Sequence, residues 1–404
     1  MQGKDNMMQT IKATRKVNIA ARVPAGLLLA GVAVLLSACS TLSSLNPFSK
    51  TAPLRDPPAP LTQFDTAMTV RTAWSASIGA AADSALKPAV AGGSVYAAAA
   101  DGTLARYDAA SGRAFWRIST GTRLTAGVGT DGQTVAVGSR DGTLLAYDDS
   151  GKLRWKAQLT SEILSAPAVG DGLVVVRSLD NRISAYEIAT GNRRWTLQRT
   201  APPLTLRAAP GIAIAGGTAF VALPGGRLLA LALSNGGPRW EASIGEPRGA
   251  TELERIADVS GTPVLVGKEV CAVAYQGRAV CLDAASGNQQ WNRPLSSTVG
   301  LGADERFVFG VDDKSVVNAY THDSGGSVWR NSKLQNRDLS APVSIGRSVA
   351  VGDREGYVHF LSREDGAFLA RTASDGSAIV GMTVAGDNLI VQSRSGLLMA
   401  LSTK

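Results

Sequence analysis

The chain has 404 residues and a formal net charge of +8, a length that suits two or three ordinary domains or one large closed all-β domain. Five basic residues and one acidic residue precede Cys39, so the remainder carries a charge of only +4, without any block of like charges. Such a weak and scattered charge argues against nucleic-acid binding, which needs clustered Lys and Arg.

The first predicted element is an export signal over residues 1–38. A basic stretch precedes an apolar run, Ala25–Leu36, that is too short to span a bilayer. Leu36-Ser37-Ala38-Cys39 resembles the lipobox of bacterial lipoproteins, in which small residues fit the signal peptidase and the cysteine thiol receives a diacylglycerol. We therefore expect lipidation at Cys39, with an ordinary buried cysteine as the alternative. Met7 and Met8 are alternative start sites because the basic region is long for a signal.

The residue after the lipobox bears on location. Ser40 lies where an aspartate would retain an enterobacterial-type lipoprotein at the inner membrane, so the resemblance implies an outer-membrane anchor that faces the periplasm. Residues 39–66 are predicted to be a flexible tether, since Ser40–Pro60 is rich in Ser, Thr and Pro and has no hydrophobic period. Residues 67–404 are assigned to the folded body.

An internal repeat of about forty residues dominates the folded body, and a period of this size indicates a propeller or a solenoid. All seven tryptophans mark it, at positions 74, 116, 155, 195, 240, 291 and 329. A shared turn precedes most of them, as in Asp108-Ala109-Ala110-Ser111-Gly112 before Trp116, and Ala370 replaces the last expected tryptophan. Each tryptophan is predicted to pack between neighbouring blades.

Each unit parses into four short strands joined by tight turns. In the first unit, Ala89–Gly92, Val95–Ala100 and Thr103–Tyr107 precede the Trp strand, and Asp101-Gly102 supplies a hairpin turn. Seven complete units follow Trp74, while the carboxy-terminal part supplies three strands and the segment around Trp74 supplies one. The sequence therefore predicts an all-β, eight-bladed propeller of four-stranded antiparallel blades, whose ring closes by pairing the first strand with the last blade.

The Asp-x-x-Ser/Thr-Gly-x-x-x-Trp repeat resembles the tryptophan-docking motif of quinoprotein dehydrogenases, which raises the possibility of an enzyme. That family holds pyrroloquinoline quinone and calcium by means that include adjacent cysteines, but this sequence contains no Cys-Cys pair. Its two histidines, His322 and His359, do not suffice for a His-rich metal site, and no Gly-rich phosphate loop occurs. We predict no catalytic, cofactor-binding or metal-binding residues and expect a protein that is not an enzyme.

Cys271 and Cys281 flank the Gln276-Gly277 turn of one hairpin. An oxidising periplasm would permit a disulfide between them. A two-residue turn, however, would place Cys271 opposite Leu282 rather than Cys281, so we expect no disulfide unless the hairpin is bulged.

The lipobox, the Pro-rich tether and eight Trp-marked blades together resemble the BamB family, the propeller lipoproteins of the outer-membrane β-barrel assembly machinery. The resemblance covers essentially the whole chain after Cys39, and two connectors make it specific. Pro203-Leu204-Thr205-Leu206-Arg207, ahead of the fourth blade, resembles the family's Leu-Ser-Leu-Arg segment that contacts BamA. Thr251–Pro263, ahead of the fifth, resembles the family's acidic segment.

The resemblance implies partner-binding roles for Leu204, Leu206, Arg207 and Asp258, where Asp258 matches the first of two contact aspartates. Ser260 replaces the second aspartate, which leaves that part of the contact open. Both connectors emerge on one face of a propeller, so these residues are expected to form one patch. The alternative is that both leucines tuck under the blades; an exposed apolar pair beside a charge is, however, the composition of a binding hot spot.

The leading hypothesis is a scaffold that binds the periplasmic domains of BamA through its connector face and assists the insertion of barrel proteins into the outer membrane. Nascent barrel proteins are a further expected partner, captured by strand addition to blade edges. No cofactor and no nucleic acid are expected. The alternatives are a periplasmic quinoprotein-like dehydrogenase and an envelope sensor or interaction propeller with another partner.

Overall fold

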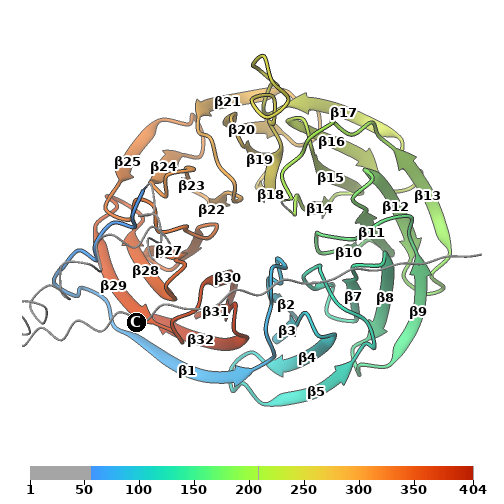
Figure 1. The fold of residues 1–404 in the computed structure, drawn as a ribbon, viewed down its shortest axis with the longest axis horizontal. Coiled ribbons are helices and arrows are strands. Elements are labelled where there is room, and N and C mark those ends of the chain that lie inside the picture. The colour runs from blue at the N-terminus through green and yellow to red at the C-terminus, as the bar shows by residue number, and fades with distance from the viewer. Residues whose placement is uncertain (1–55, 208, 404) are drawn as a thin grey trace, which may run out of the picture. The chain divides into compact units, whose positions relative to one another are not determined.

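The computed structural model describes residues 56–403 except residue 208. These residues form eight four-stranded antiparallel blades around a central axis (Figure 1). The predicted eight-bladed propeller is thereby confirmed. The predicted signal (1–38), Cys39 and the tether as far as residue 55 lie outside the described residues. Within the described residues, no helix has the length and apolar character that a membrane span requires.

Blades 1 to 4 each use four consecutive strands. They are β2 (Ala89–Ala91), β3 (Ser94–Ala98), β4 (Thr103–Asp108) and β5 (Ala114–Ser119); β6 (Gly129–Thr130), β7 (Thr134–Gly138), β8 (Thr143–Asp148) and β9 (Leu153–Gln158); β10 (Ala168–Gly170), β11 (Leu173–Arg177), β12 (Arg182–Glu187) and β13 (Arg193–Gln198); and β14 (Ile212–Ala215), β15 (Thr218–Leu223), β16 (Arg227–Ala232) and β17 (Pro238–Ser243).

Blades 5 to 7 continue the pattern, and blade 8 joins the two ends of the described chain. They are β18 (Val259–Val266), β19 (Glu269–Ala274), β20 (Arg278–Asp283) and β21 (Gln289–Pro294); β22 (Gly302–Ala303), β23 (Phe307–Val311), β24 (Val317–Thr321) and β25 (Ser327–Asn331); β26 (Val343–Ile345), β27 (Ser348–Gly352), β28 (Tyr357–Ser362) and β29 (Phe368–Ala373); and β30 (Ile379–Ala385), β31 (Asn388–Ser393), β32 (Leu397–Thr403) and β1 (Val70–Ser77).

Ring closure follows the prediction. Strand β1 pairs antiparallel with β32, with Val70 opposite Thr403 and Ser77 opposite Leu397. The second strand of a blade is buried on both faces between neighbouring sheets, as in β7 and β11, and both of these strands are rich in valine. The outermost strands instead alternate between exposed and covered residues, because only one of their faces packs on a neighbour.

Each tryptophan links its blade to the next one. Its indole N–H donates to a main-chain carbonyl in the turn that precedes the next blade's outer strand, as from Trp74 to Ala109 at 3.0 Å and from Trp195 to Leu233 at 2.7 Å; the other five do the same. Gly112 lies against the Trp74 ring so closely that a Cβ there would be 2.5 Å from it. The repeat therefore encodes blade-to-blade docking, as predicted.

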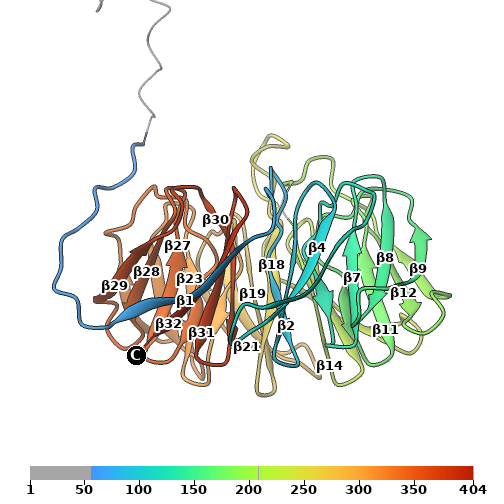
Figure 2. The same cartoon turned by 90° about the horizontal axis from the view of Figure 1, so that it is seen from below.

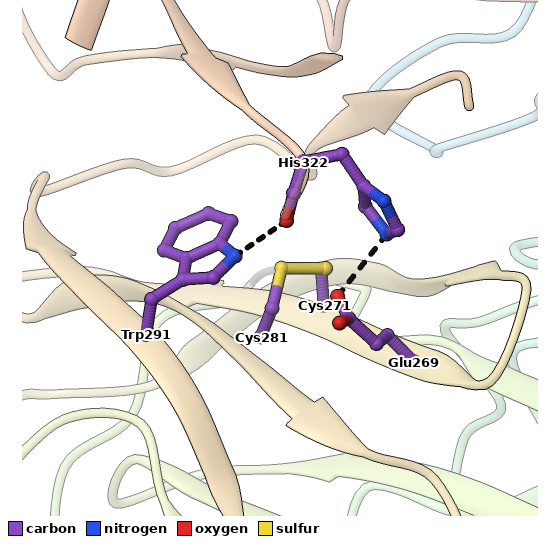
Figure 3. Close-up of a disulfide and its surroundings, with 5 residues drawn as sticks. All are labelled: Glu269, Cys271, Cys281, Trp291 and His322. Atoms are coloured by element: carbon purple, nitrogen blue, oxygen red, sulfur yellow. Dashed lines mark hydrogen bonds and ion pairs between the residues drawn. A yellow bond between two sulfur atoms is a disulfide. The ribbon is translucent and has the colours of Figure 1, made fainter. Parts of the chain in front are cut away.

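The hairpin of blade 5 corrects one prediction. Residues Cys271 and Cys281 lie directly opposite each other and form a disulfide (Figure 3). The turn has three residues, Tyr275, Gln276 and Gly277, rather than two, and the Tyr275 N–H donates to the Asp258 carbonyl. The extra turn residue shifts the register by one, so the expectation that Cys271 would face Leu282 was wrong.

The disulfide lies in the packing layer between blades 5 and 6. Both cysteines are fully buried, beside Trp291 and Tyr320. At the end of this layer, His322 approaches the Glu269 carboxylate at 3.1 Å, while its own carbonyl accepts the Trp291 N–H (Figure 3). The bond therefore fastens the two middle strands of the blade that follows the second predicted connector.

Candidate partner-binding surface

The connectors between blades all lie on one face of the ring, which we call the connector face. Each runs from the outer strand of one blade to the inner strand of the next, and the turns between second and third strands lie on the same face because the strands alternate in direction. Figure 2 shows the ring from the side, with the two faces at its upper and lower edges. Residues 199–211 and 244–258, the two connectors singled out in the sequence, are the longest of the described part.

Asp258 joins these two connectors. One carboxylate oxygen accepts the main-chain N–H of Leu206 at 2.6 Å, and the other accepts the N–H of Gly225 at 2.9 Å, in the turn of blade 4. Asp258 is only 2% exposed. The structure thus brings the predicted residues of both connectors together, but Asp258 lies beneath the surface and bonds to the main chain of its own protein.

Arg177, at the end of β11, is a buried cation that interacts electrostatically with Asp258. Burial lowers the pKa of Arg177 to about 10, although the charge of Asp258 favours its protonated form. Burial also raises the pKa of Asp258, and this effect exceeds the opposing effects of the Gly225 and Leu206 N–H groups and of Arg177. Among residues 56–403, no cation lies within ion-pair distance of Asp258. Its charge is stabilised mainly by two main-chain donors.

The first connector presents apolar and charged side chains above Asp258. Leu204 is 47% exposed, and Leu206 is half-buried. The Arg207 side chain is 60% exposed and is held by a two-pronged hydrogen bond to Glu162, with both N–O distances under 3 Å. Glu162 belongs to the previous connector, so three successive connectors contribute to one arrangement.

The second connector presents a leucine that the sequence analysis missed. Leu253 is 68% exposed, more than any other large hydrophobic residue of the described chain. It lies in a turn closed as a capping box: the Glu254 carboxylate accepts the N–H groups of Ala250 and Thr251, while the Thr251 hydroxyl accepts the Glu254 N–H. These bonds lower the pKa of Glu254. The Thr-x-x-Glu spacing of Thr251 and Glu254 is the sequence pattern that could have predicted this turn.

Leu179 is a further exposed leucine on the connector face, and it belongs to blade 3. It is 38% exposed and lies in the turn between β11 and β12, where its N–H donates to the Glu162 carbonyl. Of six exposed large hydrophobic residues in the described chain, three lie on the connector face and three on outer strands. We define the connector patch as Leu179, Leu204, Leu206, Arg207 and Leu253.

Ser260, which replaces the second family aspartate, is also buried. Its hydroxyl donates to the Ser297 carbonyl at 2.7 Å, in the next connector. It contributes to the joint between blades 5 and 6 rather than to the connector patch.

One cluster of potential metal ligands occurs in the described residues: Glu269, Cys271 and Cys281. Because the two sulfur atoms are bonded to each other, neither is a thiolate that could bind a metal.

Comparison with known proteins gives a consistent result. The family model described as outer membrane protein assembly factor BamB matches residues 61–121, 100–331 and 313–404. The BamB of Bordetella pertussis is 46% identical over 91% of this chain and 95% of its own length. The BamB of Escherichia coli K12 is 34% identical, with 93% of this chain and 98% of its own length covered.

Two solved structures place the fold. BamB from Moraxella catarrhalis matches with a TM-score of 0.76 and 28% identity, over 83% of this chain and 100% of its own. A quinohemoprotein alcohol dehydrogenase from Comamonas testosteroni matches with a TM-score of 0.65 and 13% identity, over 82% and 76% of the two chains. The second likeness concerns the propeller fold alone.

Proposed function

The chain belongs to the BamB family of outer membrane protein assembly factors, and from this premise we propose that it is a scaffold subunit of the β-barrel assembly complex that binds BamA through the connector patch. In this role it assists the insertion of barrel proteins into the outer membrane. The main support for this binding site is the pair of hydrogen bonds that Asp258 accepts from Leu206 and Gly225. These bonds hold two long connectors together and leave Leu204 and Arg207 exposed.

Within this proposal the predicted residues divide into two roles. Leu204, Leu206 and Arg207 contact BamA, with Leu204 as an apolar anchor and Arg207 as a charge oriented by Glu162. Asp258 positions Leu206 from beneath, since both of its oxygens are engaged and the residue is buried. Preorganisation of this kind lowers the entropy that binding must overcome.

The proposed location is the periplasmic side of the outer membrane, with a diacylglycerol on Cys39 as the anchor. The lipobox sequence and Ser40 support it. We also propose that the protein is not an enzyme. Its extensive sequence similarity is to assembly factors, whereas it is only 13% identical to the quinohemoprotein alcohol dehydrogenase that shares its fold.

The test is recovery of BamA with the tagged, lipidated full-length protein from detergent-solubilised outer membranes. Arg207→Glu should abolish BamA recovery, because it reverses an exposed charge and places it beside Glu162. Arg193→Glu is the matched control, since Arg193 is also an exposed arginine but lies on β13, the outer strand of blade 3. Undiminished recovery with Arg207→Glu would show that the partner binds elsewhere.

A further inference from the structure

Residues 58–68, which we call the strap, lie along the outside of blade 7 before the chain enters β1. At the connector face, the Ala59 N–H donates to the Gln335 carbonyl at 2.9 Å, and the Arg337 guanidinium donates to the Ala59 carbonyl at 2.9 Å. Gln335 and Arg337 both belong to the connector that leads into blade 7. The predicted boundary between tether and propeller, at residues 66 and 67, falls inside this segment.

The middle of the strap is held by side chains of β29. The Phe64 ring stacks on the Phe368 ring, with 5.0 Å between centroids, and the Arg371 guanidinium lies 5.1 Å from the Phe64 centroid. Arg371 also donates to the Thr62 carbonyl at 3.1 Å. An aromatic ring and a main-chain carbonyl of the strap are thus recognised together.

The strap ends at the opposite face of the ring. The N–H groups of Ala67 and Met68 both donate to the Leu369 carbonyl, at the beginning of β29. Arg347, in the turn between β26 and β27, donates to the Ala67 carbonyl. Figure 2 shows this path, in which the blue segment descends from the upper to the lower edge of the ring before β1 begins.

The strap also occupies a particular joint of the ring. Ala370 stands where the other outer strands have a tryptophan, and buried Met68 packs in the same hydrophobic cluster as Ala370, between blades 7 and 8. The strap therefore reaches the one joint of the repeat that lacks a docking tryptophan.

The receiving site is built of buried charges. The Arg337 side chain is 3% exposed and pairs with Asp353 at 2.8 Å and Glu355 at 2.5 Å, while the remaining part of its guanidinium donates to the strap. Asp353 in turn bonds to His359, and His359 accepts from Arg371. One connected network therefore binds the strap at Ala59 and at Thr62.

We propose that the outer surface of blade 7 is a binding site for the chain's own extended segment, and that it fixes the exit of the membrane tether at the connector face. Without the strap contacts, the chain would leave the propeller at Val70, at the start of β1 and on the opposite face. The inference rests on the proposed lipid anchor at Cys39. It places the point where the chain leaves the propeller on the same face as the connector patch.

The length of the tether makes this choice of face matter. Residues 40–57, 18 in number, separate Cys39 from the strap, so this part of the chain can reach at most about 60 Å even if it is fully extended. With the strap bound, the connector face is the one that stays nearest the bilayer. With the strap released, the tether gains the length of the strap and leaves from the far face.

The test uses the lipidated full-length protein in vesicles of phosphatidylethanolamine and phosphatidylglycerol that carry a headgroup quencher. A fluorophore is attached to Arg140→Cys, in the turn between β7 and β8 on the connector face, or to Gln133→Cys, in the turn between β6 and β7 on the opposite face. In the proposed lipoprotein Cys39 is blocked by its diacylglycerol, and the other two cysteines are bonded to each other, so the introduced thiol reacts alone. We expect stronger quenching at position 140.

Phe64→Ser removes the stacked ring and leaves every strand residue of the propeller unsubstituted, and Gln63→Ser, at an exposed strap position, is its control. Phe64→Ser should make amide exchange of residues 58–68 roughly tenfold faster, and the quenching difference should shrink or reverse. Ala59→Pro, which removes the N–H that Gln335 accepts, is a second variant with the same expected direction.

Equal or stronger quenching at position 133 in the unmodified protein would overturn the proposal, as would an unchanged difference when exchange shows that the strap has been released. Failure of the lipid anchor has a separate signature: the protein would lack the added diacylglycerol mass and would not float with the vesicles.

Discussion

The connector patch and the strap are both irregular segments, and each rests on a buried ionisable side chain that bonds to its main chain. Asp258 accepts from two N–H groups under the patch, whereas Arg337 donates to a carbonyl of the strap. The difference lies in charge compensation. Arg337 contacts two carboxylates, but Asp258 has no ion-pair partner among residues 56–403. The charges of the strap cluster compensate one another, whereas the carboxylate of Asp258 is buried and compensated mainly by two main-chain N–H groups.

The pKa directions follow this contrast. Burial alone would raise the pKa of Asp353, but bonds from His359, the Tyr357 N–H and Arg337 hold it below its usual value. Burial raises the pKa of Asp258, and its partners do not offset that effect. A residual cost of this kind is expected if Asp258 preorganises a binding surface, where function rather than stability is served.

The largest expected effect is on the strap cluster. Arg337→Met should lower the free energy of unfolding by about 3–5 kcal/mol, because it leaves the carboxylate of Asp353 buried without its guanidinium partner. Urea unfolding followed by tryptophan fluorescence measures it. Arg354→Met is the control: Arg354 pairs with Asp338, which is 70% exposed, so the loss should stay under about 1 kcal/mol. Equal losses in the two variants would mean that the network is not cooperative.

Asp258→Ala should affect stability less and binding more. It leaves the N–H groups of Leu206 and Gly225 without acceptors, at about 1–3 kcal/mol, but it also removes the cost of a buried charge. We expect a net loss of about 1–2 kcal/mol in unfolding free energy and at least a roughly tenfold loss in affinity for the BamA periplasmic domains.

Ser260→Ala separates the two effects of that substitution. It removes a buried hydrogen bond to Ser297 in the same region and should cost about 1 kcal/mol of stability without weakening binding. If both variants weaken BamA binding equally, Asp258 acts through general destabilisation of blade 5 and not by positioning Leu206.

The outer surface of the patch should show the reverse pattern. Leu253→Ala and Leu204→Ala should each reduce BamA affinity by about 1–2 kcal/mol, as expected for apolar hot spots. Their unfolding free energies should change by less than about 0.5 kcal/mol, since both side chains are exposed. Leu153→Ala is the matched control, because Leu153 is 46% exposed but lies on outer strand β9. An affinity loss in the control alone would move the interface to the rim.

The contrast between regular and irregular parts also explains what the sequence could predict. Blade number, ring closure and tryptophan docking repeat along the chain, so local patterns defined them. The placement of Leu204 and Asp258 on one face followed from connectivity and family resemblance. The burial of Asp258 could not be predicted in this way. A buried carboxylate needs hydrogen-bond donors, and those of Asp258 are main-chain N–H groups 52 and 33 residues away in the sequence.

Two other features escaped prediction for physical reasons. The Gln276-Gly277 pair was interpreted as a two-residue turn, but the chain turns over three residues, with the Tyr275 N–H bonded to Asp258. That single added residue brings Cys271 opposite Cys281. The strap has no hydrophobic period, and its order comes from side chains of blade 7 that lie about 280–310 positions later in the sequence.

The smallest expected effect is on the pH dependence of the unfolding free energy, to which the two buried clusters contribute with opposite signs. His359 accepts from Arg371 through Nδ1 and donates to Asp353 through Nε2, an arrangement that suits the neutral ring. Burial lowers the pKa of His359, an effect that Arg371 and Arg337 reinforce and Asp353 opposes. The unfolded chain therefore takes up a proton below pH 6.5 that the folded protein does not, and stability falls as pH falls.

This single group can contribute at most about 1.4 kcal/mol of lost stability per pH unit below its unfolded pKa. Urea midpoints at pH 7.5 and 5.5 should therefore differ more in the unmodified protein than in His359→Gln. Asp258 has the opposite sign, because its raised pKa lets the folded state take up a proton first; its ionised form costs stability as pH rises through that pKa. Asp258→Ala should thus make the unfolding free energy fall more steeply with decreasing pH. The same pH dependence in Asp258→Ala and His359→Gln would show that the two clusters do not differ in charge compensation.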